Sequence, residues 1–196
     1  SILDSNKQLK VASIFSHLAA SGETQWEDFT KEQITKFNES YKLLAENLKN
    51  KPIKHLVNSS GILRYPEAHF DMVRLGLGLY GINTDKQNDL EPVGTFKTTI
   101  SQIREVKKGE SVGYGRVGKL TKDGKIAVIA VGYSDGFSRA LSNGKGNVFI
   151  HGKKCKVLGN ICMDMSMIDI SNLKDVKVGD EVEIFGKNIL VAEIAA

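Results

Sequence analysis

Between KVASIFS at residues 10–16 and IKHLVNSSG at residues 53–61, the chain passes from an apolar, strand-like run through an amphipathic segment to a second such run. Thr30 and Gln33 form a capping-box pattern that predicts the start of a helix there. Apolar residues then recur at steps of three and four on one face: Ile34, Phe37, Tyr41, Leu44 and Leu48. Strand, helix, strand is the order of an α/β fold with parallel strands.

Candidate functional residues follow the predicted strands, where parallel α/β folds gather their functional groups. His17 follows the first strand and the run Asn58-Ser59-Ser60-Gly61 follows the second. Residues 72–75 predict a third strand, with Arg74 and Gly76 at its end. The Asn58–Gly61 run supplies hydroxyls and backbone N–H groups that suit a phosphate, and it equally suits a helix cap.

The second half of the chain has a different pattern. Residues 1–92 hold 5 glycines and residues 93–196 hold 14. In the second half the hydrophobic period changes to two, and frequent turn signals separate short strand-like runs. VKVGDEVEIF at residues 176–185 predicts a closing hairpin around Gly179-Asp180. This pattern predicts a small antiparallel barrel or sandwich.

Charge divides the chain at the same place. Residues 1–92 hold 11 Lys and Arg residues and 12 Asp and Glu residues. Residues 93–196 hold 16 Lys and Arg residues and 11 Asp and Glu residues. We therefore expect a domain boundary near Glu91 and Pro92, with a partial α/β domain over residues 1–92 and a β domain over residues 93–196. The basic half has no run of like charges and few aromatics among its Lys and Arg residues, so a β module that binds nucleic acid is a minor alternative.

Composition places the chain among ordinary globular proteins, with 196 residues that are 41% hydrophobic and 26% charged. No apolar run reaches the roughly 18 residues that a bilayer span needs, and the first residues lack a signal-peptide pattern. We expect a cytoplasmic protein without membrane contact. The cysteines, Cys155 and Cys162, predict neither a disulfide framework nor a metal site, because no His/Cys partner motif accompanies them.

Two motifs in the second half could carry chemistry. Tyr114 lies between Gly113 and Gly115, which permit close approach of a ligand or another chain, although a strand tyrosine beside a bulge is the simpler interpretation. ICMDMSM at residues 161–167 is most simply interpreted as a core strand in which methionine fills gaps. Each motif is weak by itself.

The order and spacing of six motifs resemble the alanine racemases, pyridoxal-phosphate enzymes with an α/β barrel followed by a β domain. The motifs are SHLA at 16–19, HLVNSSG at 55–61, DMVRLGLGLYG at 71–81, VGYGR at 112–116, VGYSDGFSRALSN at 131–143 and GNICMDMSMIDI at 159–170. The resemblance covers essentially the whole chain. It implies the C-terminal portion of a TIM-type α/β barrel followed by a small antiparallel β-barrel or sandwich domain.

The resemblance implies a site for pyridoxal 5'-phosphate in the first domain. Arg74 would donate to the pyridine nitrogen, and because arginine keeps its proton, that nitrogen would stay largely unprotonated. His17 would lie against the cofactor ring and help to orient Arg74. Loop residues would hold the cofactor phosphate: Asn58, Ser59, Gly76 and Leu77.

The resemblance also implies racemisation of alanine by two acid/base groups on opposite faces of a pyridoxal-phosphate aldimine. One group would be a lysine that also forms the Schiff base. The other would be Tyr114, contributed to the neighbouring subunit of a head-to-tail homodimer. Implied substrate-binding residues are Met163, Asp164, Tyr133 and Arg139. The product, D-alanine, would serve peptidoglycan synthesis.

The sequence departs from the family pattern in two respects. Asn160 replaces an arginine often found before the CMD run, which alters the charge of the substrate corridor. No cofactor-lysine motif is present, and only about three of eight barrel strands can be found, so we expect an inactive fragment of a longer racemase. A racemase for serine or a basic amino acid is the close alternative. Single-domain pyridoxal-phosphate carrier proteins share the barrel but lack the VGYGR and CMDM motifs.

Overall fold

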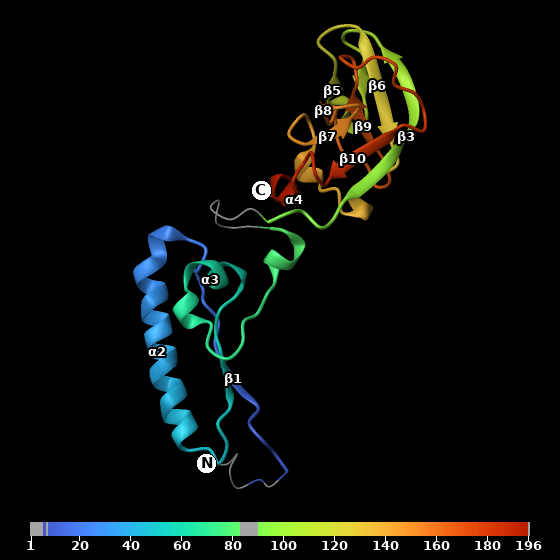
Figure 1. The fold of residues 1–196 in the computed structure, drawn as a ribbon. Coiled ribbons are helices and arrows are strands. Elements are labelled where there is room, and N and C mark those ends of the chain that lie inside the picture. Colours follow the sequence, from blue (N-terminus) through green and yellow to red (C-terminus); the bar gives the residue numbers. More distant parts are fainter. Residues whose placement is uncertain (1–5, 7, 83–89, 196) are drawn as a thin grey trace. The chain divides into compact units, whose positions relative to one another are not determined.

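The computed structural model describes residue 6 and residues 8–82 and 90–195. The chain divides into two compact units, Ser1–Glu91 and Pro92–Ala196, here termed the α/β unit and the β unit (Figure 1). Each unit has its own buried apolar cluster. The predicted fold class is confirmed, with parallel strands and helices in the first unit and an antiparallel sheet in the second.

The α/β unit is centred on a parallel pair of short strands, β1 (Ser13–Phe15) and β2 (Ile53–His55). Their register sets Ser13 opposite Ile53 and Phe15 opposite His55. A 3-10 turn, η1 (Thr24–Trp26), and helix α2 (Glu27–Glu46) connect them. Parallel strands require such a crossover, because a tight turn cannot return the chain to the same end of the sheet.

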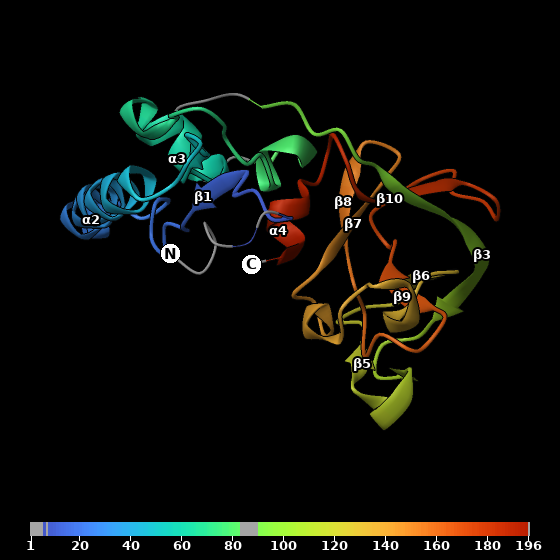
Figure 2. The ribbon, with the colours of Figure 1, turned by 90° about the horizontal axis from the view of Figure 1, so that it is seen from below.

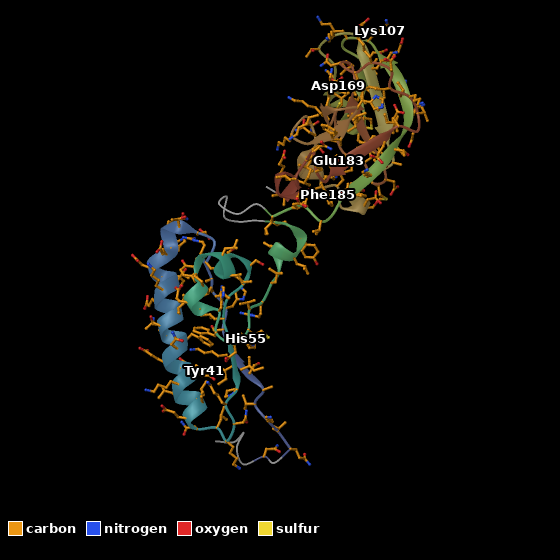
Figure 3. All side chains as sticks on the ribbon, in the orientation of Figure 1. Tyr41, His55, Lys107, Asp169, Glu183 and Phe185 are labelled. Atoms are coloured by element: carbon orange, nitrogen blue, oxygen red, sulfur yellow. The ribbon has the colours of Figure 1, made fainter. Side chains whose placement is uncertain are left out.

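Helix α2 packs on this pair through one apolar face. Ile34 and Phe37 join Leu18, Leu56 and Val57 in the buried cluster of the unit. Tyr41, labelled in Figure 3, is also buried on this face, and its O–H donates to the Pro52 carbonyl at 2.7 Å. The predicted stripe is therefore confirmed at Ile34, Phe37 and Tyr41. The prediction is wrong at Leu44, which is exposed, and at Leu48, which lies beyond the end of α2 at Glu46.

Helix α2 begins earlier than the capping-box pattern predicts. Its first residue is Glu27, and Thr30 lies inside the helix, where its hydroxyl donates to the Trp26 carbonyl at 3.0 Å. Gln33 does not cap the helix either, because its Oε1 accepts from the Ala19 N–H at 3.1 Å. The capping-box prediction is wrong. Acidic side chains in the first turn favour this end through the helix dipole instead.

The predicted third strand, residues 72–75, is reduced to a single parallel bridge between Met72 and β2. Beyond it the backbone N–H of Arg74 donates to the Val57 carbonyl at 3.1 Å. The segment therefore still runs beside β2 and brings Arg74 to the carboxyl end of that strand.

Three short helical segments complete the α/β unit: α3 (Ser59–Arg64), η2 (Pro66–Ala68) and η3 (Leu77–Tyr80). Asn58 caps α3, because its Oδ1 accepts from the Gly61 N–H at 3.0 Å, so the cap interpretation of this run is confirmed. Only glycine fits at residue 61. A Cβ there would lie 2.9 Å from Val57 Cβ and 3.3 Å from Leu18 Cδ1.

The β unit is built on a six-stranded antiparallel sheet in the order β8-β7-β10-β3-β6-β9. The strands are β3 (Phe96–Val106), β6 (Gly124–Ile129), β7 (Asn147–Ile150), β8 (Lys153–Lys156), β9 (Ser166–Asp169) and β10 (Glu181–Phe185). The long strand β3 curves along the sheet between β10 and β6 (Figure 2). A bridge between Val157 and Ile168 joins the two ends, so the sheet is a nearly closed barrel.

Several shorter elements lie outside this sheet in the β unit. A two-stranded ribbon of β4 (Ser111–Val112) and β5 (Gly118–Lys119) encloses the turn η4 (Tyr114–Arg116). The turns η5 (Tyr133–Asp135) and η6 (Arg139–Leu141) follow β6, and helix α4 (Val191–Ala195) ends the described chain. β-Branched side chains fill the barrel interior, among them Val148, Ile168 and Val182. Each such side chain contributes roughly 1.5–3 kcal/mol when fully buried.

Three expectations for the β unit are wrong. Residues 176–185 do not form a hairpin, since only the second half is a strand, β10, which pairs with β3 and β7. Instead the Gly179 N–H donates to the Ile100 carbonyl at 2.8 Å. Residues 161–167 enter a strand only at Ser166, and Tyr114 lies in a 3-10 turn, not in a strand.

Glu183, in the middle of β10, carries a buried carboxylate (Figure 3). Its oxygens accept from the Asn188 N–H and Nδ2 at 2.8 Å each and from the Ile189 N–H at 3.3 Å. Burial raises the pKa of this carboxyl, but the hydrogen bonds and the nearby Lys97 outweigh burial, so the pKa lies below its ordinary value. Glu183 thereby ties the turn after β10 to the sheet.

We expect Glu183→Gln to destabilise the β unit by about 1–3 kcal/mol at pH 7, because donors face both carboxylate oxygens, two backbone N–H groups at Oε1 and Asn188 Nδ2 at Oε2, and the amide has only one accepting oxygen. A carboxyl whose pKa is lowered in the folded state stabilises the fold above its unfolded pKa, ordinarily 4.5, and loses that effect as pH falls through the folded value. The two proteins should therefore converge in acid. Urea unfolding followed by the methyl NMR signals of Ile168 and Ile184 measures this.

The matched control is Glu181→Gln on the same strand. Glu181 forms an exposed ion pair with Lys97 at 2.7 Å, so its loss should change the stability by less than about 1 kcal/mol. Equal stability of wild type and Glu183→Gln at pH 7 would contradict the prediction.

Candidate functional site

A hollow of about 370 Å³ opens at the carboxyl ends of β1 and β2 in the α/β unit. Its lining contains every residue predicted to hold a cofactor, together with two neighbours: His17, Asn58, Ser59, Ser60, Arg74, Leu75, Gly76 and Leu77. The structure thus brings together side chains from three separate segments of the chain. This is where parallel strands end and their loops supply polar groups.

Ser59 forms the floor of a small polar cradle. Its Oγ accepts from the Gly76 N–H at 2.8 Å and from the Gly78 N–H at 3.1 Å. A hydroxyl oxygen has two lone pairs, so both are engaged and the hydroxyl proton is left to donate. Leu77, as the first residue of η3, has an N–H that the 3-10 turn does not need. The cradle therefore presents donors, as an anion requires.

Arg74 is one of the residues that line the hollow. Its Nη2 donates to the Ser16 carbonyl and to the Leu56 carbonyl, the latter at 2.8 Å. Its guanidinium carbon lies 5.2 Å from the centre of the Phe15 ring. The Nε–H is buried and has no hydrogen-bond partner in the described part of the chain. A buried donor without a partner is costly, so this N–H is suited to a ligand acceptor.

His55 is a residue of this region that the sequence analysis did not single out. It is buried at the end of β2, where Figure 3 labels it. Its ring stacks on Phe15 with centroids 5.1 Å apart and planes 11° apart. Burial and then the charge of Arg74 lower the pKa of its imidazole. Its Nδ1 has no partner among the described residues. A histidine preceding the LVNSSG run was the available signal.

His17 and Asn58 are linked at the rim of the hollow. Asn58 Oδ1 accepts from the Gly61 N–H and from the Ser21 hydroxyl at 2.8 Å, which leaves its Nδ2 as a donor. That Nδ2 lies 3.4 Å from His17 Nε2, so Nε2 is the accepting nitrogen in this contact. The helix cap of α3 thus also fixes the orientation of the His17 ring.

In the β unit, four predicted substrate residues lie around one pair of loops. The Tyr133 N–H donates to the Cys162 carbonyl at 2.9 Å. The guanidinium of Arg139 lies over the Tyr133 ring, 5.8 Å from its centre. The hydroxyl of Ser134, which sequence patterns did not single out, lies 2.8 Å from the Met163 carbonyl and 3.0 Å from Asp164 Oδ1, and its one proton is shared between these two acceptors. Serine within VGYSDG was not distinctive enough to be found alone.

Tyr114, the predicted catalytic residue, projects from η4 with 74% of its surface exposed. Asn160, two residues before Cys162, donates its Nδ2 to the Tyr114 carbonyl at 3.0 Å. The Tyr114 turn is therefore tied to the segment that carries Met163 and Asp164. All five predicted residues of the β unit gather in one region of that unit.

Other classes of site are not found within residues 8–82 and 90–195. No three His, Cys, Asp or Glu side chains there are grouped so as to hold a metal ion. In the same ranges, no helix has the length and apolar character needed to cross a membrane. Both cysteines are free thiols.

The fold and these sites define a two-unit protein, α/β then β, with a hollow lined by hydrogen-bond donors at the ends of parallel strands. A family model described as "Alanine racemase, N-terminal domain" matches residues 1–84, and one described as "Alanine racemase, C-terminal domain" matches residues 93–196. The chain belongs to the alanine racemase family, whose members depend on pyridoxal phosphate.

Known proteins extend this result. Alanine racemase 1 of Clostridium acetobutylicum is 41% identical over 183 residues, which cover 91% of this chain and 47% of the relative. The alanine racemase of Clostridium tetani is 40% identical over 186 residues, 92% of this chain and 48% of the relative. This chain spans about half the length of the curated relatives it matches.

Solved structures show the same fold. The biosynthetic alanine racemase of Pseudomonas aeruginosa matches with a TM-score of 0.85 and 30% identity, over 99% of this chain and 53% of that one. The alanine racemase of Bartonella henselae with covalently bound pyridoxal phosphate matches with a TM-score of 0.84 and 28% identity, over 96% of this chain and 52% of that one.

Because the pKa of His55 is lowered in the folded state, protonation favours unfolding, and we expect the α/β unit to lose stability as pH falls below the ordinary value of 6.5. The slope should reach at most about 1.4 kcal/mol per pH unit. His55→Phe, which keeps the stack on Phe15, should flatten this slope. Trp26 is the single tryptophan and lies in this unit, so its fluorescence during urea unfolding at pH 5 to 7.5 measures the effect. Identical slopes in the two proteins would contradict the prediction.

Proposed function

We propose that this chain is part of a pyridoxal-phosphate-dependent amino acid racemase that interconverts L-alanine and D-alanine, and so supplies D-alanine for peptidoglycan. The observation that carries the proposal is a hollow that brings together Arg74, whose Nε–H has no partner among the described residues, and the Ser59 hydroxyl, whose proton is left to donate. Membership of the alanine racemase family supports it.

The residues of the hollow fit pyridoxal phosphate. The Ser59 hydroxyl, which already accepts two N–H bonds, would donate to the phosphate, and the Leu77 N–H would join it. The Arg74 Nε–H would donate to the pyridine nitrogen. His17, held by Asn58, would lie against the ring. Bound pyridoxal phosphate withdraws electrons from the Cα of an attached amino acid and so acidifies its proton.

Arg74 suits rapid proton exchange at Cα. A guanidinium keeps its proton at any working pH, so it donates to the ring nitrogen without protonating it. Arg74 would thereby limit how strongly the cofactor stabilises the charge left at Cα, which would favour return of the proton over side reactions.

In the β unit, Tyr114 would exchange a proton with the substrate Cα on one face. Met163 would donate its backbone N–H to the substrate carboxylate. Because the Tyr133 N–H holds the Cys162 carbonyl, the trans peptide between Cys162 and Met163 directs the Met163 N–H to the opposite side. Asp164 lies beside it, and Tyr133 with Arg139 would restrict access to small amino acids.

We further infer a head-to-tail homodimer in which Tyr114 serves the site of the neighbouring subunit. The support is its exposure, 74%, on a turn that carries it away from the sheet. If Tyr114 acted only within its own subunit, we would expect its ring to pack against residues of that subunit. Each subunit would then complete the other's site.

Ser59→Ala should weaken binding of pyridoxal phosphate to the native full-length protein by about 10-fold or more, because it removes a hydrogen bond to a charged group. Pyridoxal, which lacks the phosphate, is the control ligand and should bind wild type and variant alike. Equilibrium dialysis with absorbance detection measures both ligands. Equal weakening of both would show that Ser59 acts on the shape of the hollow and not on the phosphate.

Tyr114→Phe in the native full-length protein should reduce racemisation of alanine by at least about 100-fold, because it removes an acid/base group, and should leave the bound-cofactor absorbance unchanged. Chiral chromatography of L-alanine incubated in D2O measures both the inversion and the exchange at Cα. Serine, lysine and arginine assayed in parallel decide between an alanine racemase and a racemase for another amino acid. Loss of the cofactor spectrum in the variant would instead assign Tyr114 a structural role.

A further inference from the structure

The turn that carries Tyr114 has an unfavourable backbone. Gly113 and Gly115 have φ angles of 75° and 72°, and Arg116, which is not glycine, has a φ of 56°. Left-handed angles are easily adopted by glycine but disfavour residues with a Cβ. Such a backbone persists only where surrounding contacts determine it. The direction in which Tyr114 points therefore depends on what holds this turn.

Two side chains hold it. Arg116 Nε donates to Ser111 Oγ at 2.9 Å and anchors the end of the turn to β4. Asn160 Nδ2 donates to the Tyr114 carbonyl at 3.0 Å and anchors its centre. A Cβ on Gly115 would lie 3.7 Å from the same Asn160 nitrogen. Asn160 thus packs against the turn as well as bonding to it.

The amide of Asn160 is itself oriented by a second amide. Its Oδ1 accepts from Asn143 Nδ2 at 3.1 Å. A carbonyl can only accept, so Tyr114 requires the NH2 end of Asn160, which leaves the oxygen for Asn143. The two hydrogen bonds, from Asn143 to Asn160 and from Asn160 to Tyr114, therefore determine which end of the Asn160 amide faces Tyr114. A flipped amide at residue 160 would lose both hydrogen bonds.

We propose that Asn160 is a positioning residue for Tyr114: its amide, oriented by Asn143, holds the Tyr114 carbonyl and sets the direction of the phenol. This inference rests on the proposed function, because positioning matters to a reaction only if Tyr114 exchanges the proton. Displacement of a reacting group by about 1 Å can reduce a rate by about 100-fold.

The chain offers matched variants. Asn160→Asp keeps the shape but replaces the donor to Tyr114 by an oxygen that repels the carbonyl. Asn143→Gly removes only the second amide, and glycine accepts the φ of 60° found there. Asn172→Asp, at an exposed turn of the same unit, controls for the added negative charge.

In the native full-length protein, Asn160→Asp should lower kcat for alanine by about 10- to 100-fold with little change in KM, because substrate contacts are intact and the acid/base group is misplaced. The isotope effect of Cα-deuterated alanine should rise more in one direction than in the other, because only one face uses Tyr114. Asn143→Gly should be intermediate, and Asn172→Asp should match wild type. Amide hydrogen exchange of a peptide covering residues 112–117 should be faster in Asn160→Asp.

The outcomes separate this inference from the function on which it rests. If wild type does not racemise alanine, the proposed function fails, and hydrogen exchange alone tests the contact: faster exchange in Asn160→Asp supports it and equal exchange overturns it. If wild type racemises alanine and Asn160→Asp has the same kcat, the function stands and the positioning role is overturned. A raised KM with unchanged kcat would also overturn it, because Asn160 would then act on substrate binding.

Discussion

The guanidinium of Arg74 joins the carboxyl ends of β1 and β2. The Ser16 and Leu56 carbonyls lie where the two strands end, and one Arg74 nitrogen donates to both. The Arg74 backbone N–H also donates to the Val57 carbonyl, so the segment at residues 72–75 is held beside β2. Unpaired carbonyls at strand ends would otherwise be costly to bury. One residue therefore closes the strand ends, and its Nε–H is left without a partner among the described residues.

The rest of the hollow follows from this arrangement. Gly76 and Gly78 are close to Arg74 in the chain, so the position of Arg74 brings their N–H groups to Ser59. Asn58 and Ser59 directly follow β2, and the cap that starts α3 also contacts His17. The site is thus a consequence of how the ends of β1 and β2 and the segment beside β2 are held together, and not of any one loop.

In the β unit, the loop at Gly132 and the loop at Met163 are held together by a close approach of their backbones. A Cβ on Gly132 would lie 2.1 Å from the Met163 carbonyl oxygen, so only glycine lets these two loops meet. The sheet beneath is rigid, and the chemical groups lie on the loops above it. Part of the basic charge of this unit has a structural role. Lys153, Lys154 and Lys156 are exposed on the end strand β8, where charge discourages pairing with another chain.

The sequence alone determined the fold class and the order of the units, and a family resemblance supplied the candidate residues of the β unit. Hydrophobic periodicity and turn residues act over a few neighbouring positions, so they also mark the strand ends of the α/β unit. His17, Asn58, Ser59 and Arg74 were found in this way, since each follows or ends an apolar run. Only the tertiary structure decided the start of α2, the loss of the 176–185 hairpin, and the roles of His55, Ser134 and Asn160. Each of these depends on a hydrogen bond or ring contact between residues far apart in the chain, such as Gln33 to Ala19, Gly179 to Ile100 and Asn160 to Tyr114. Such contacts are chosen by packing among many residues, and no local pattern of sequence encodes them.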